Sequence, residues 1–366
     1  MMELRWKHLA IALTIFPVAI IVFAWIGFFN IGASTGHWKV TEWLLHSAMR
    51  TAVKTYALLE VDAPAQLPRH DIGPAAGHFA RGCAICHGAP GELVSPSAQR
   101  MLPPPPDLTE KVGEWNDAEL FWIVKYGVRF TGMPAWPTQA RDDEVWAMVA
   151  FLRELPGMSA QSYRALSLGQ SGRLEISPRG FANAIAECSR CHGRDGLKAG
   201  GLVPIIAGQK EGYLLASLRS YADRERRSGI MALPISALDP AVFPDVARHF
   251  SRQPSRLRQI MPDEDDRSDG ARIVFGGAPD RAIPSCFGCH GNTAIRNETY
   301  PDIAGQDEHY IANQLRLFRA AARGGGQNAH LMHKSAERLS DADINALAAF
   351  LGALAAKNAT PTAAQR

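Results

Sequence analysis

The most hydrophobic stretch of the chain lies near its start. Residues 9 to 29 are apolar, broken only by one threonine, one proline and one glycine. About 20 apolar residues cross a bilayer as a helix, and Arg5 and Lys7 ahead of the stretch favour a cytoplasmic N-terminus. We therefore predict a transmembrane anchor over residues 1–31, with the rest of the chain outside the cytoplasm.

A cleaved signal peptide is the alternative to this anchor. The apolar region of a signal peptide is usually about 7–15 residues long, which is shorter than the stretch here. Gly32-Ala33-Ser34 offers a weak cleavage site. Both interpretations deliver the remaining residues to the same compartment, and we favour the anchor.

An amphipathic pattern follows in residues 32–70. Apolar side chains recur at nearly helical intervals, with charged residues between them: Trp38, Trp43, Leu44, Met49, Val53 and Tyr56, against Lys39, Glu42, Arg50 and Lys54. Such a helix would extend the anchor, lie on the membrane surface, dock on another subunit or cover the next domain. Pro64 and Pro68 mark the linker that ends this region.

The pattern after residue 70 is helical throughout, with no convincing strand. A short helix is expected from Ala75 to Gly82, and another from Asp142 until Pro156 stops it. A closing helix follows Ser340, where Ser-x-x-Asp resembles a capping box. We predict an all-α chain with domains at 71–160, 161–262 and 263–356, and a disordered tail at 357–366.

The second and third of these segments repeat each other. Residues 204–209 (Pro-Ile-Ile-Ala-Gly-Gln) match residues 301–306 (Pro-Asp-Ile-Ala-Gly-Gln). Tyr213 pairs in the same register with Tyr310, and Arg226 pairs with Arg323. So many matches at one offset indicate an internal duplication.

One five-residue motif occurs once in each segment and sets the chemistry. It reads Cys-x-x-Cys-His, and its functional residues are Cys83, Cys86 and His87, then Cys188, Cys191 and His192, then Cys286, Cys289 and His290. This is the attachment signature of c-type haem. The two thiols form thioethers to the porphyrin, and the adjacent histidine reaches the iron. We therefore predict three covalently attached haem c groups.

Other uses of these cysteines fit less well. Structural zinc normally takes four ligands from two such pairs, and a thioredoxin-like pair would not recur at intervals of about a hundred residues. All six cysteines of the chain lie in the motifs, so none is left for a disulfide, a nucleophile or an axial thiolate. The formal net charge of +3 is small and gives no indication of a nucleic-acid partner.

Each haem iron needs a second axial ligand or remains open for chemistry. A methionine opposite histidine raises the reduction potential and suits electron transfer. The candidates are Met133, in a Gly-Met-Pro loop, Met231 and Met332. Met148 is better explained as core packing, and Met261 lies too late in its domain. A histidine neighbouring Met332, either His330 or His333, is an alternative ligand of the third iron.

Two further features concern the surroundings of each haem. The ring N–H of the iron-binding histidine needs an acceptor, and a backbone carbonyl in the Pro-x-Leu/Ile segments that start at Pro106, Pro204 and Pro301 is the candidate. Arg226 and Arg323 are candidates to neutralise haem propionates. Plain solvation is the alternative for these two arginines.

All three units resemble class I cytochrome c. The first, with Pro-Asp107-Leu108, Trp122 to Gly127 and Thr131 to Trp136, resembles the single-haem cytochromes that accompany bacterial dehydrogenases and oxidases. The second and third resemble the di-haem c-four type. The resemblance implies crossed terminal helices, His/Met ligation, exposed haem edges and a close pairing of the last two domains. The second domain departs from it, because it lacks an Arg-Gly-Gly run and because Pro244 interrupts its last helix.

The three haem motifs, each with a methionine candidate, favour an electron carrier. We assign no catalytic residue. We expect a single-pass tri-haem cytochrome of the bacterial inner membrane, with its haem domains on the periplasmic side. It would transfer electrons between respiratory complexes, to or within a terminal oxidase or bc-type chain. The alternatives are an electron-accepting subunit of a membrane-bound dehydrogenase, and a haem enzyme with one open iron. The middle haem segment is more basic than its two neighbours, which would steer redox partners or hold the domains together.

Overall fold

The computed structural model describes residues 6–27, 30–169, 180–257, 266–291 and 297–354. Within these ranges the chain is built of helices and contains no β-strand, only isolated bridges. The predicted all-α class is therefore confirmed for the described part of the chain. The predicted tail at 357–366 and Met261 lie outside the described residues.

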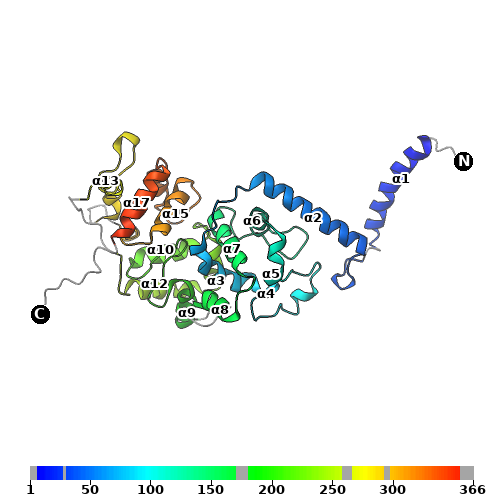
Figure 1. Cartoon of the computed structure of the whole chain (residues 1–366), viewed down its shortest axis with the longest axis horizontal. Helices are drawn as coiled ribbons and strands as arrows, with labels where there is room; N and C mark the ends of the chain where they lie inside the picture. Colours follow the sequence, from blue (N-terminus) through cyan, green and yellow to red (C-terminus); the bar gives the residue numbers. More distant parts are fainter. Residues whose placement is uncertain (1–5, 28–29, 170–179, 258–265, 292–296, 355–366) are drawn as a thin grey trace.

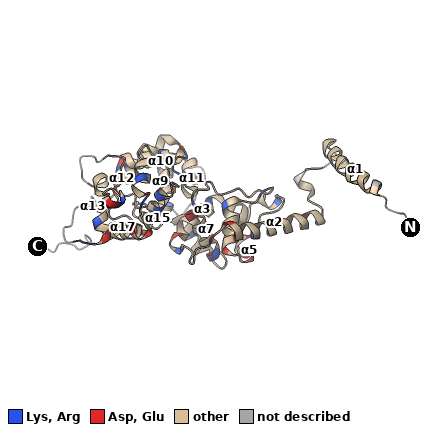
Figure 2. Cartoon of the chain, turned by 90° about the horizontal axis from the view of Figure 1, so that it is seen from above, with Lys and Arg blue, Asp and Glu red and all other residues tan. Residues whose placement is uncertain are grey.

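The N-terminal helix lies at one end of the molecule and the C-terminal helices lie toward the other (Figure 1). Helix α1 (Trp6–Trp25) lies at one end, and α2 (Lys39–Glu60) joins it to the rest. The window from His8 to Trp25 has a mean hydropathy of 2.2, and none of it is buried against the protein. Figure 2 shows how few charged side chains α1 carries compared with the rest of the chain. A helix of this kind is a membrane span or a signal sequence.

Helix α2 covers the first group of haem-region helices. Val53 and Ala57 are buried on its inner face, and the Tyr56 ring stacks on Trp122 of α6 (Asp117–Tyr126) with 5.8 Å between ring centroids. Arg50 pairs with Glu114 at 3.0 Å. One predicted role of this segment, covering the next domain, is confirmed. Its other face remains exposed, with Leu44, Leu58 and Leu59 in solvent.

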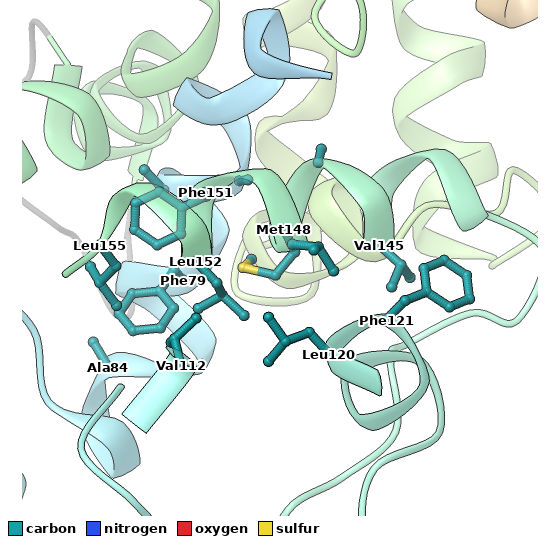
Figure 3. Packing of buried hydrophobic residues seen from close by; sticks show 14 of the residues in the cluster. Phe79, Ala84, Val112, Leu120, Phe121, Val145, Met148, Phe151, Leu152 and Leu155 are labelled. Atoms are coloured by element: carbon teal, nitrogen blue, oxygen red, sulfur yellow. The ribbon is translucent and has the colours of Figure 1, made fainter. Parts of the chain in front are cut away.

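The first group comprises α3 (Ile72–Gly82), α4 (Ala84–His87), α5 (Leu108–Lys111), α6, α7 (Asp142–Glu154) and α8 (Ala160–Leu168). Its core lies where α3, α6 and α7 meet, and Figure 3 shows Val145, Met148 and Leu152 of α7 gathered with Leu120 and Phe121 of α6 and Phe79 of α3. Met148 is buried, as predicted for a core residue. Helix α3 starts three residues before the expected Ala75.

Helix α8 also packs on this first core. Tyr163 is fully buried there, and its ring meets Phe79 edge-on at 6.3 Å. The second domain is predicted to begin at residue 161, but the packing partners of Tyr163 are in the first group.

The second group contains α9 (Gly180–His192), α10 (Glu211–Ala222), α11 (Gly229–Ser236) and α12 (Phe243–Ser251). Phe243, Val246 and Phe250 of α12 form much of its core. The expectation that Pro244 interrupts the last helix is wrong: the proline lies in the first turn of α12. A first-turn proline removes no helical hydrogen bond, because that N–H has no partner within the helix.

The third group contains α13 (Asp269–Gly276), α14 (Phe287–His290), α15 (Glu308–Arg319), α16 (Ala329–Ala336) and α17 (Asp341–Ala353). Its core is formed mainly by α13, α15 and α17, with Ile344 and Leu347 of α17 almost fully buried. The predicted capping box at the start of α17 is present, because Ser340 and Asp343 exchange side-chain to backbone hydrogen bonds.

Candidate haem-binding sites

The three Cys-x-x-Cys-His motifs lie at the ends of helices. The first and third form the short helices α4 and α14, and the second ends α9. All six cysteines are described, and none is disulfide-bonded. A helical turn brings the two thiols to one side and the following histidine close to them. In this arrangement both cysteines can bond to one porphyrin while the histidine binds its iron.

Each motif histidine is oriented by the carbonyl oxygen of a proline. The Nδ1–H groups of His87, His192 and His290 donate to the carbonyls of Pro106 at 2.8 Å, Pro204 at 3.2 Å and Pro301 at 2.8 Å. The predicted acceptors in the Pro-x-Leu/Ile segments are therefore confirmed. This bond fixes the tautomer and leaves Nε2 as the lone-pair nitrogen that can bind iron.

Burial keeps these groups in their uncharged forms. It lowers the pKa of His192 to about 4, and it also lowers the pKa values of His87 and His290. It raises the pKa values of the Cys83 and Cys188 thiols to about 12. A neutral imidazole is the form that ligates a metal, and a thioether sulfur carries no charge, so both environments fit covalent haem.

Met133 lies on a tight loop between α6 and α7. The amide of Val128 donates to the Met133 carbonyl at 3.2 Å, and the amide of Trp136 donates to the Lys125 carbonyl at 3.0 Å. The Met133 amide is held by the Thr131 hydroxyl at 3.1 Å. The loop is therefore closed by three hydrogen bonds, and Met133 is presented on a defined backbone.

Met231 and Met332 lie instead on the short helices α11 and α16. Both side chains are half-buried and pack against the cores of their own groups. His330 is exposed, and the Nε2–H of His333 donates to the Arg323 carbonyl at 2.6 Å. His333 Nε2 is engaged by this bond, whereas Met332 lies beside the core of its own group.

Arg226 and Arg323 meet where the second and third groups touch. Arg226 donates to the Tyr310 hydroxyl at 3.0 Å, and Arg323 donates to the Tyr213 hydroxyl at 3.4 Å. Burial and the neighbouring Arg226 charge lower the pKa of Arg323. Although burial alone would raise it, the two guanidinium charges lower the pKa of Tyr213 to about 8.

The surroundings of Arg226 and Arg323 favour binding of haem propionates over plain solvation. Two adjacent buried cations are costly unless an anion accompanies them. Arg323 Nε is buried and has no hydrogen-bond partner among the described residues. A carboxylate is the acceptor that suits such a guanidinium, so the site has the donors that haem propionates require.

Two glutamines tie the second group to the third. Gln209 donates to the Asp302 carbonyl at 2.9 Å and accepts from the Asp302 amide at 2.8 Å. Gln306 makes the equivalent pair with Ile205, at 3.0 Å and 2.7 Å. Each glutamine therefore binds a residue of the other group, and that residue directly follows the proline whose carbonyl orients the motif histidine. The repeated Ala-Gly-Gln sequence pointed to these residues, but their role across the interface was not predicted.

A contact between the first group and the second motif was also not predicted. Arg190, between the two motif cysteines of α9, is buried and donates to the carbonyls of Gly77 at 2.8 Å and Ser167 at 2.9 Å. Glu187 pairs with Arg81 of α3 at 2.8 Å. A charged residue inside a haem motif is the one signal that could have suggested a contact there.

Comparisons with known proteins agree with these features. Residues 71–152 match the family model described as cytochrome c oxidase, cbb3-type, subunit III, and residues 274–355 match the cytochrome c family. The thiosulfate dehydrogenase electron acceptor of Thiomonas intermedia is 34% identical over 198 residues, covering 52% of this chain and 90% of the relative. Cytochrome c4 of Pseudomonas aeruginosa is 30% identical, covering 52% of this chain and 95% of the relative.

Among solved structures, reduced cytochrome c4 from Pseudomonas stutzeri is 28% identical, covering 48% of this chain and 98% of that one, with a TM-score of 0.41. The two curated relatives are covered almost from end to end at 30% identity or more. The chain therefore belongs to the class I c-type cytochromes, and it is an electron-transfer protein whose three motifs carry three covalently bound haem c groups.

Proposed function

We propose that this protein is a membrane-anchored tri-haem cytochrome that passes electrons between respiratory complexes, to or within a terminal oxidase or bc-type chain. One observation carries the proposal: in each of three helical groups of a single chain, the motif histidine donates a hydrogen bond to a proline carbonyl. Bound haem supplies one-electron iron chemistry. The surrounding residues hold it, orient its histidine and exclude water.

The ligand set belongs to this proposal. Cys83 and Cys86, Cys188 and Cys191, and Cys286 and Cys289 would form the thioethers. The axial pairs would be His87 with Met133, His192 with Met231, and His290 with Met332. All three methionines are half-buried, and Met231 and Met332 pack beside the cores of their own groups, which supports this set. The three haem-bearing groups would be separate domains, with the first extended through α8 because Tyr163 packs in its core.

We also propose that α1 stays in the bacterial inner membrane and that the haem domains lie on its periplasmic side. The apolar length of α1 supports this, and so does the full exposure of its window from His8 to Trp25 within the described part of the chain. Arg5 and Lys7 precede the apolar stretch, and their charge supports the orientation.

A second partner class is favoured by the relatives. Two of them, from Thiomonas intermedia and Stutzerimonas stutzeri, are named as electron acceptors of thiosulfate dehydrogenase, and the latter is 32% identical. By this alternative the chain would accept electrons from a dehydrogenase and pass them on through its three haems.

Absorption spectroscopy of the purified ferric protein tests the ligand set. Methionine-ligated ferric haem gives a charge-transfer band near the red edge of the visible spectrum, and we expect contributions from all three irons. Met133→Ala, Met231→Ala and Met332→Ala should each remove one contribution. Carbon monoxide binding by the unaltered protein, or a high-spin iron in it, would contradict the proposal.

The partner class can be tested with the full chain in detergent. The pre-reduced protein should be oxidised by membranes that contain a terminal oxidase, and cyanide should block the reaction. Reduction by thiosulfate with purified thiosulfate dehydrogenase, without oxidation by the oxidase membranes, would favour the acceptor alternative.

A further inference from the structure

The first group reaches into the second at the segment that carries Met231. Glu144 is the third residue of α7, is 1% exposed and directs its carboxylate toward the start of α11 rather than toward its own helix. The two residues involved, Glu144 and Ser228, are far apart in the sequence and belong to different groups.

The carboxylate of Glu144 accepts hydrogen bonds from both sides of this interface. Its Oε1 accepts from the Ser228 hydroxyl at 2.5 Å and pairs with Arg141 at 3.0 Å. Its Oε2 accepts from the amides of Gly229 at 2.6 Å and Ile230 at 3.3 Å, and from Trp136 Nε1 at 3.2 Å. Arg141 also donates to the Arg227 carbonyl at 3.1 Å.

These bonds satisfy the free end of the helix that carries Met231. The first amides of a helix have no acceptor within it, and here Glu144 accepts from the first two. The Met231 amide donates to the Ser228 hydroxyl oxygen at 3.0 Å, and that hydroxyl in turn donates to Glu144. A carboxylate at a helix N-terminus is also favoured by the helix dipole. The backbone of Met231 is therefore held by a network that begins in another group.

The interface is closely packed around this network. A Cβ atom at Gly229 would collide with the Trp136 ring, so only glycine fits there without a shift. The Trp136 ring lies in turn against His78 of α3, with 4.3 Å between ring centroids and 32° between the ring planes. The start of α11 has little room to move while the first group is docked.

The third group ties the helix that carries Met332 by contacts of its own. Met332 follows Arg323 by nine residues, whereas Met231 follows Arg226 by five. Helix α16 is tied within its own group, by its N-cap Asn328 to Thr299 at 2.9 Å and by His333 to the Arg323 carbonyl at 2.6 Å. Asp343, the third residue of α17 and the counterpart of Glu144, pairs with Arg281 of its own group at 2.7 Å.

We propose that Glu144, supported by Arg141, is a positioning residue by which the first haem domain holds the axial-methionine segment of the second haem. The inference rests on the proposed ligation of the second iron by Met231. It makes the ligation and the reduction potential of the middle haem dependent on the docking of the neighbouring domain.

The test is Glu144→Gln in the full-length holoprotein, purified in detergent. Glutamine has nearly the same shape, but it loses the charge and places an amide NH2 against groups that themselves donate. We expect the charge-transfer band to lose the contribution of one iron and one of the three potentials to fall, with haem content and helical circular dichroism unchanged. In a Met231→Ala background, Glu144→Gln should remove no further part of the band.

Asp343→Asn is the matched control, because it alters the same helix position where the contacts stay within one group. It should leave the contribution of the second haem unchanged. If Glu144→Gln does not accumulate, Ser228→Ala tests the same network and should act in the same direction. Three unchanged bands and potentials in Glu144→Gln would overturn the inference while leaving the ligand set intact. An unchanged band in Met231→Ala would show instead that the proposed ligation is wrong.

Discussion

At the scale of single residues, each iron site is oriented by a hydrogen bond from a histidine ring to a backbone carbonyl. A proline carbonyl accepts from Nδ1 of His87, His192 or His290 and so commits Nε2 to the metal side. Proline has no N–H, so its carbonyl is the only backbone hydrogen-bonding group that it offers. The orientation of the histidine therefore depends on the path of the backbone after each motif.

The loop that carries Met133 gives a prediction at this scale. Gly127 has φ +67°, and a Cβ there would lie 2.6 Å from the Pro134 carbonyl carbon and 2.7 Å from the Met133 carbonyl oxygen. With ψ −169°, Gly127 lies in a backbone region that essentially only glycine adopts, so Gly127→Ala should cost about 1–3 kcal/mol for the backbone alone, and the overlap should displace the loop. We expect a lower melting temperature and a weaker charge-transfer band from the first haem.

Gly157→Ala provides the control for this variant. Gly157 also has a positive φ, +81°, in the same group, but no atom lies within 4 Å of the position that a Cβ would take there. It should show a similar backbone cost with an unchanged band. Equal losses of the band in both variants would mean that the contacts of Gly127 do not control Met133.

Residues whose partners are near in sequence could be predicted, and residues whose partners are distant could not. The motif cysteines, the histidines and the proline acceptors all follow from spacing within about 20 residues. The contact of Arg190 with Gly77 depends on how separate groups pack, and so does the burial of Arg323 Nε, which has no hydrogen-bond partner within the described ranges. Neither periodicity nor a motif encodes such packing in a single sequence.

At the scale of elements, the second and third groups are joined by backbone segments rather than by side chains alone. Gln306 is buried and bonds both the amide and the carbonyl of Ile205. Ile205 directly follows Pro204, whose carbonyl orients His192. We therefore expect a change at Gln306 in the third group to affect the second haem through Ile205.

Gln306→Ala tests this connection. It would leave the Ile205 amide and carbonyl without partners in a buried site, which costs about 1–3 kcal/mol for such groups. We expect faster hydrogen exchange at the Ile205 amide and a shifted potential of the second haem. Gln99→Ala is the control, since Gln99 makes an exposed bond to Val94 within the first group. Unchanged exchange at Ile205 would contradict the role given to Gln306.

The elements differed in how well the sequence predicted them. Helices α7 and α17 were recognised because acidic or capping residues precede a helical apolar pattern. A loop was expected only for Met133, and no element was predicted for Met231 and Met332, which lie on the helices α11 and α16. Gly229 and Pro234 obscure α11 in the sequence, and contacts from the first group stabilise its start.

At the scale of the whole molecule, the first group contacts both of the others. Asp71 accepts from the Leu202 amide of the second group at 2.7 Å, and Asp143 accepts from Asn313 of the third at 2.8 Å. The rings of His70 and His309 lie 4.6 Å apart. The three groups are therefore docked on one another, with α1 projecting at one end (Figure 1).

The projecting helix gives the last prediction. Its apolar side chains are exposed along its whole length, for example Phe16 at 69% and Ile21 at 61%, and burying that surface in lipid is strongly favourable at roughly 25 cal/mol per Å². We expect the protein to remain in membranes washed with alkaline carbonate and to need detergent for release. Its intact mass should contain residues 6–25 together with three haem additions. A version in which α1 is replaced by a cleavable signal peptide should be soluble with an unchanged haem spectrum, whereas recovery of the natural protein from the soluble periplasm without residues 6–25 would show that α1 is a signal sequence.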